Sequence, residues 1–200
     1  MKQFIEKIKR RKLLSLMFII SIIGIICGLL FISVLSNENK DMITTSVKGF
    51  FDTIFSNNII YKDVLLKSLL NNLILNIIIW LLGISIIGIF ILYFILFFKC
   101  FMVSFTFISI LYTFKFNGIF LSFIYVVPYI LNLFIYFVLI YYALAFSKTL
   151  FNYLFRKKDC NRSEFVKRYI ILLIVSCLLL VFSSLIEVFL VPFLLNLIKL

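Results

Sequence analysis

The chain lacks histidine, and glycine and proline are scarce, with six and two residues among 200. Without histidine it has neither the commonest general base nor the commonest metal ligand. Its four cysteines, Cys27, Cys100, Cys160 and Cys177, show no C-x-x-C spacing, and none lies in the segment that we place outside the cell. Phosphate-binding loops, nucleophile elbows and paired catalytic carboxylates are also absent. We therefore expect no disulfide framework, no metal site, no cofactor and no enzymatic activity.

Apolar residues dominate what is present. They make up 64% of the chain, and the mean hydropathy is +1.22. A soluble domain of this size has too little interior to bury so much apolar surface, so lipid must cover the rest. The net charge of +12 would suit nucleic acid in a soluble protein. Here the basic residues cluster beside apolar runs, as in membrane proteins, so we expect no nucleic-acid partner.

The sequence predicts an all-α, polytopic integral membrane protein with one membrane domain over residues 1–200. Five spans are expected in the bilayer, at 13–35, 73–98, 101–116, 119–147 and 169–195. The third is brief, because a rise of ~1.5 Å per residue leaves it short of a ~30 Å hydrocarbon core. It is either a thin span between Lys99 and Lys115 or a re-entrant turn. Pro128 should kink the fourth span, since proline lacks an N–H group.

Charge predicts the orientation of these spans. The residues before the first span and the loop 148–168 are the most basic parts of the chain. Basic loops stay in the cytoplasm, which puts the N-terminus inside and, after five spans, the C-terminus outside. A cleaved signal peptide is the rival interpretation of the first span, but its apolar run is too long. The segment 36–68, whose charges balance, is then extracytoplasmic.

The outer segment carries a periodic apolar face. Phe50, Phe51, Ile54 and Phe55 recur at helical spacing and predict an amphipathic helix. Such a face can lie on the bilayer surface, pack on the protein's own spans, or bind a partner. We favour the first two interpretations over a partner groove.

Few polar residues interrupt the apolar runs. Glu187 is the one acid deep in such a run, which indicates an ion path or an ionic lock between helices, or else a structural hydrogen bond near the outer interface. Asn71, Asn72 and Asn132 can form hydrogen bonds between helices.

A G-x-x-x-G motif lies in the first span. Gly24 and Gly28 would allow close helix contact, either within the chain or in a homo-oligomer.

Several short blocks resemble the stage II sporulation protein M family. They are residues 54–58, the pair 71–72, and the runs 80–89, 97–101 and 186–192, together with Gly118 and the step 127–128. The length and the five-span topology also match. The chain departs from the family at a few positions. Phe90 replaces a common proline, and Cys100 and Ser104 stand where glycine is usual. Tyr129 replaces the polar residue that often follows the mid-membrane proline.

The resemblance implies a non-enzymatic role in endospore formation. Such a protein sits in the septal membrane and holds two peptidoglycan-degrading partners, the stage II sporulation proteins D and P, during forespore engulfment. A different hypothesis, drawn from the residues, is a small transporter or permease subunit in which Glu187, Pro128 and Asn132 line a path. A third is a structural protein that acts through lipid packing.

Overall fold

The computed structural model describes residues 2–56, 60–85, 87–156 and 162–197, and every regular element in these ranges is helical. The elements are α1 (Lys2–Val34), α2 (Asn37–Phe55), α3 (Tyr61–Ile84), α4 (Gly88–Phe114), α5 (Gly118–Arg156), α6 (Arg162–Leu185), the π-helical segment η1 (Ile186–Leu190) and α7 (Val191–Leu197). An α-helix satisfies its own backbone hydrogen bonds, which lipid cannot do. The predicted all-α class is confirmed.

Within the described residues, five helical stretches are long and apolar enough to cross a membrane. They are Lys12–Val34, Tyr61–Ile84, Gly88–Phe114, Gly118–Phe151 and Val166–Leu197. The last of them runs through α6, η1 and α7. The predicted polytopic membrane architecture with five spans is thereby confirmed.

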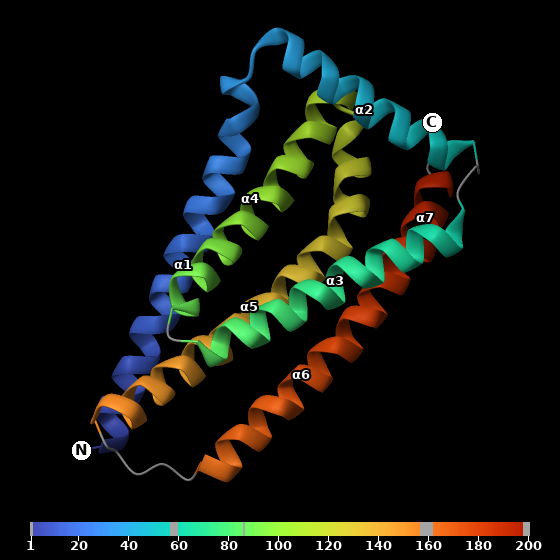
Figure 1. The fold of residues 1–200 in the computed structure, drawn as a ribbon. Helices are drawn as coiled ribbons and strands as arrows, with labels where there is room; N and C mark the ends of the chain where they lie inside the picture. Colours follow the sequence, from blue (N-terminus) through green and yellow to red (C-terminus); the bar gives the residue numbers. More distant parts are fainter. Residues whose placement is uncertain (1, 57–59, 86, 157–161, 198–200) are drawn as a thin grey trace.

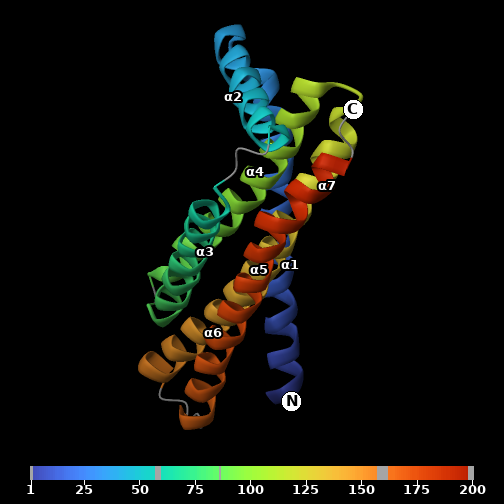
Figure 2. The same ribbon diagram turned by 90° about the vertical axis from the view of Figure 1, so that its right-hand side faces the viewer.

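The helices form an open frame. In Figure 1, α1 and α4 run side by side, α3 diverges from α4 after their connection, and α5 passes behind both. Helix α2 lies across one end of the frame, between the end of α1 and the start of α3. Figure 2 shows α3 on one side of the molecule and the N-terminal half of α1 on the other. The N-terminus lies at the opposite end from α2, as do the end of α5 and the start of α6.

The connection between the second and third spans lies earlier than the sequence predicted. We expected spans at 73–98 and 101–116, but α3 ends at Ile84 and one long helix runs from Gly88 to Phe114. The third span is thus full length, and neither a thin span nor a re-entrant turn. Lys99, predicted to mark the end of the second span, lies inside α4.

Local chemistry explains this tight apolar turn. Ser85 is extended, and its N–H group bonds to the Leu82 carbonyl at 3.1 Å. The Ser85 carbonyl, which the helix leaves without a partner, accepts a hydrogen bond from the Ser147 hydroxyl at 2.9 Å. Gly88 packs against the Leu82 carbonyl, where a Cβ atom would collide. The turn therefore needs no charged residue.

The last two spans also differ from their predicted limits. Helix α5 continues through Pro128 to Arg156, and α6 starts at Arg162, so most of the predicted loop 148–168 is helical. Figure 1 shows α5 changing direction along its length, as expected of a helix that contains proline. The residues that separate α5 from α6, 157–161, lie outside the described part of the chain.

Helix α2 packs on the protein's own spans. Phe51 and Ile54 are buried, at 1% and 4% exposure, in an apolar cluster with residues of α4, α5 and α7. Phe55 borders this cluster, while Phe50 stays 45% exposed. Most of the predicted apolar face is thus used inside the molecule, which is the self-packing alternative.

The glycines of α1 are used in the same way. A Cβ atom on Gly24 would lie 2.7 Å from the Phe97 carbonyl oxygen, and one on Gly28 would lie 2.5 Å from that of Phe101. Cys100 and Ser104 are the small residues that face them. The G-x-x-x-G motif therefore joins α1 to α4 within one chain and offers no free surface to a second copy.

Candidate functional site: an intramembrane polar network

Glu187 lies in the π-helical turn between α6 and α7. The backbone N–H group of Val191 donates to the Ile186 carbonyl, five residues earlier. In an α-helix the acceptor lies four residues earlier. Pro192 follows at once, and the ring of a proline clashes with the carbonyl four residues before it, so the widened turn accommodates that ring. The turn presents Glu187 to α3 and α5.

Two hydroxyl groups from different helices bind the Glu187 carboxylate. Ser68 of α3 donates to Oε2 at 2.7 Å, and Tyr129 of α5 donates to Oε1 at 2.9 Å. Tyr125 lies one turn from Tyr129, and their hydroxyl oxygens are 3.0 Å apart. These two bonds fasten α3 and α5 to the last span.

The network continues along α3 toward the middle of the membrane. Asn72 donates from Nδ2 to the Ser184 hydroxyl at 3.1 Å, and Ser184 lies 3.3 Å from Ser68. The Tyr136 hydroxyl donates to Asn72, 3.0 Å from Oδ1 and 3.2 Å from the backbone carbonyl oxygen. These bonds connect α3 with both α5 and α6.

Lys99 ends this chain of polar groups. Its Nζ atom lies 5.1 Å from the centroid of the Tyr136 ring, within cation–π range. Lys99 is eleven positions after Gly88, the start of α4, which places it about 16 Å along that helix at a rise of ~1.5 Å per residue. Asn72 is equally central in α3. A lysine at this depth is costly and is a default candidate for function.

Two cavities flank the network. The Glu187 cavity, about 680 Å³, is lined by α2, α3, α5, η1 and α7, and includes Asp63, Lys67 and Asn71. The Lys99 cavity, about 270 Å³, is lined by α3, α4 and α5, and includes Asn72, Thr106 and Asn132. Tyr129 belongs to both walls.

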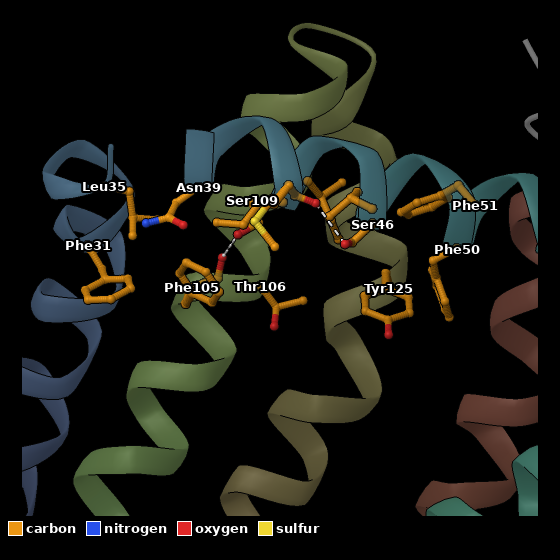
Figure 3. A pocket seen from close by; sticks show the side chains of 14 residues that line it. Phe31, Leu35, Asn39, Ser46, Phe50, Phe51, Phe105, Thr106, Ser109 and Tyr125 are labelled. Atoms are coloured by element: carbon orange, nitrogen blue, oxygen red, sulfur yellow. Dashed lines mark hydrogen bonds between the residues drawn. The ribbon is translucent and has the colours of Figure 1, made fainter. Parts of the chain in front are cut away.

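A third cavity lies beneath α2. This α2 cavity, about 570 Å³, shares Phe50 and Tyr125 with the Glu187 cavity and Thr106 with the Lys99 cavity. Figure 3 shows α2 above it, with Phe31 from α1, Phe105 and Thr106 from α4, and Tyr125 from α5 around it. The three cavities therefore adjoin one another.

Two asparagines in the spans keep a buried atom without a hydrogen bond. Asn132 is 5% exposed and Asn76 is fully buried, and the Oδ1 atom of each has no partner among the described residues. Asn76 is otherwise bound, since its Nδ2 donates to Ser176 at 3.0 Å. Buried polar groups are rarely left unpaired, so these two amide oxygens are exceptions.

The predicted polar positions meet only in part. Asn72 and Glu187 join one network through Ser68 and Ser184. Asn71 is exposed at the edge of the Glu187 cavity, and Asn132 lies in the wall of the Lys99 cavity.

Sequence reasoning missed Lys99, Tyr129 and Tyr136 as members of the site. It placed Lys99 at the cytoplasmic end of the second span, because the apolar turn before Gly88 carries no charge that would mark the end of α3. The glycines at 83 and 88, with Ser85 between them, were the signal that would have placed Lys99 in mid-span.

Comparison with known proteins gives the family. No curated protein and no solved structure matches the chain. The family model described as stage II sporulation protein M matches residues 17–192, which include all five spans almost entirely. With its multi-pass helical architecture and its match over most of its length, the chain is a sporulation-related membrane protein that belongs to the stage II sporulation protein M family.

Proposed function

We propose that this protein is a non-enzymatic scaffold that localises the peptidoglycan-degrading stage II sporulation proteins D and P at the sporulation septum during forespore engulfment. The match to the family over residues 17–192 carries the proposal. The family is not a known family of enzymes. The open frame, whose α3 and α4 diverge, also leaves long helical faces available to partners in the membrane (Figure 1).

The proposed orientation places the α2 end outside the cell and the N-terminus inside. The start of α1, the end of α5 and the start of α6, all rich in Lys and Arg, lie at the same end of the frame (Figure 1). Positive charge next to short loops stays in the cytoplasm. Cysteine substituted for the exposed Ser46 of α2 should then react with a membrane-impermeant maleimide in intact cells, while cysteine at Lys148 should react only after lysis.

Deletion of the gene tests the scaffold. Under sporulation conditions, membrane-dye imaging should show a septum whose membrane fails to migrate around the smaller compartment. Tagged full-length protein should also co-purify the D and P proteins from sporulating cells. Normal engulfment in the deletion strain, or no co-purification of either hydrolase, would rule out the scaffold function.

A transporter or permease subunit that uses Glu187 is the second candidate. The observation that favours it is the pair of cavities that meet at Tyr129, one holding Glu187 and the other Lys99. In proteoliposomes with an internal pH dye, Glu187→Gln should abolish proton entry, whereas Glu38→Gln on the exposed side of α2 should not. Equal fluxes in wild type and Glu187→Gln would exclude this role.

A further inference from the structure

We propose that the face between α3 and α4 seats a transmembrane helix of a partner protein, and that Lys99 binds a carboxylate which this helix carries near the middle of the membrane. The inference rests on the proposed scaffold function, because it assigns the surface and the chemistry by which the scaffold holds a partner.

The surface is a groove that opens sideways. The α2, Glu187 and Lys99 cavities share wall residues. Helices α3 and α4 diverge from their connection, and α2 lies across one end of the frame (Figure 1). At the mouth of the Lys99 cavity, Phe98 and Met102 are 44% and 45% exposed. An occupant must therefore come from within the membrane plane rather than from water.

Charge decides what kind of occupant fits. The described residues that line the Lys99 cavity include no acid, and the ammonium group lies over the ring of Tyr136. A cation in mid-membrane is costly unless it is paired. A negatively charged group that enters at this depth would supply the counter-charge of the ammonium group.

Glu187 does not fill this place. Its charge acts on Lys99, but its two carboxylate oxygens accept hydrogen bonds from Ser68 and Tyr129, and it lines the other cavity. A second copy of the chain brings no other acid to this depth, because the acids within the described spans are Glu187 and Asp63, and Asp63 lies in the first turn of α3. Lipid chains bring no charge at this depth. The complementary partner is a different protein with an aspartate or glutamate inside its own span.

Co-purification of the D and P proteins with full-length variants tests the charge. Lys99→Met should lower recovery of at least one hydrolase by more than about tenfold, since an unpaired buried charge on the partner is strongly unfavourable. Lys99→Arg keeps the charge and should retain recovery. Lys148→Met, an exposed lysine outside the groove, is the matched control and should behave as wild type. Melting temperature in detergent checks that each variant is folded.

Photo-crosslinking tests the place. A photoreactive phenylalanine analogue at Met102 should crosslink to the captured hydrolase, and one at Phe134, exposed on α5 outside the three cavities, should not. If Lys99→Met recovers both hydrolases as wild type does, or if Met102 yields no crosslink, the groove is occupied by lipid and the inference is wrong, while the scaffold stands. If wild type recovers neither hydrolase, the scaffold proposal fails and this inference fails with it.

Discussion

Helix α4 has two faces that differ in how closely other helices pack against them. Toward α1, Cys100 and Ser104 meet Gly24 and Gly28, and the backbones approach so closely that no methyl group would fit. Toward α3, the neighbouring residue Lys99 borders a cavity. In lipid, helices associate through close packing and hydrogen bonds rather than through a hydrophobic drive. The closed face therefore supplies stability, and the open face is free to serve binding.

The largest expected effect is on the packing of α2 at the end of α4. Phe51→Ala should lower the free energy of unfolding by about 3–5 kcal/mol, because it leaves a cavity in a fully buried cluster. Phe50→Ala, one residue away and 45% exposed, should cost less than about 1 kcal/mol. Unfolding by SDS in mixed micelles, followed by circular dichroism, measures both. Equal losses in the two variants would contradict the burial of Phe51.

Gly28→Ala tests the closed face of α4 directly. The added Cβ atom meets the Phe101 carbonyl, so the free energy of unfolding should fall by about 1–3 kcal/mol. The same change at Gly49 of α2 is the control, since nothing lies within 4 Å of that Cβ. Alanine there should stabilise the helix by about 0.5–1 kcal/mol. Should Gly28→Ala prove as stable as Gly49→Ala, the close α1–α4 contact would be disproved.

Tyr136→Phe tests the polar network behind the open face. Loss of the hydroxyl removes the hydrogen bond to Asn72 and should cost about 0.6–2 kcal/mol, the usual range between membrane helices. Tyr142→Phe, half-exposed on the same helix, should be neutral in the same SDS titration. An unchanged free energy of unfolding in Tyr136→Phe would show that the network does not hold α3 to α5.

Lys99→Met should have the smallest effect on the isolated protein. Replacing a cation in the membrane by an apolar side chain of similar length should change the free energy of unfolding by less than about 0.5 kcal/mol, or raise it. The same variant is expected to lose partner recovery, which separates binding from stability at this position. A loss of stability beyond about 2 kcal/mol would instead make Lys99 a structural residue, as in a buried pair that has been broken.

Much of the architecture could be predicted from hydropathy, but the turns could not. Five apolar stretches imply five spans whatever their exact limits, since each needs only length and composition. The α3–α4 turn was misplaced because Ser85 and the glycines at 83 and 88 carry no charge. The bond from Ser147, 62 residues further on, is what satisfies the Ser85 carbonyl. A local pattern cannot reveal that partner.

The candidate site could likewise be predicted only in part. The asparagines and Glu187 could be singled out because polar groups are rare and costly in lipid. Their partners, Tyr129 and Tyr136, look like ordinary aromatic residues of a span until α5 is placed beside α3. The role of Lys99 depended on the location of one turn.

By itself, the order of apolar and basic residues determined that this chain is a helical membrane protein with five spans, because a bilayer imposes a length and an internally bonded backbone on every span. Only the tertiary structure decided which face of each helix is closed and which is open. That choice depends on contacts between residues far apart in the chain, such as Gly24 with Cys100 and Glu187 with Ser68. Sequence periodicity carries little of this information, because lipid and the protein interior are both apolar. The face of a span that contacts lipid can therefore have the same composition as the face that contacts other helices.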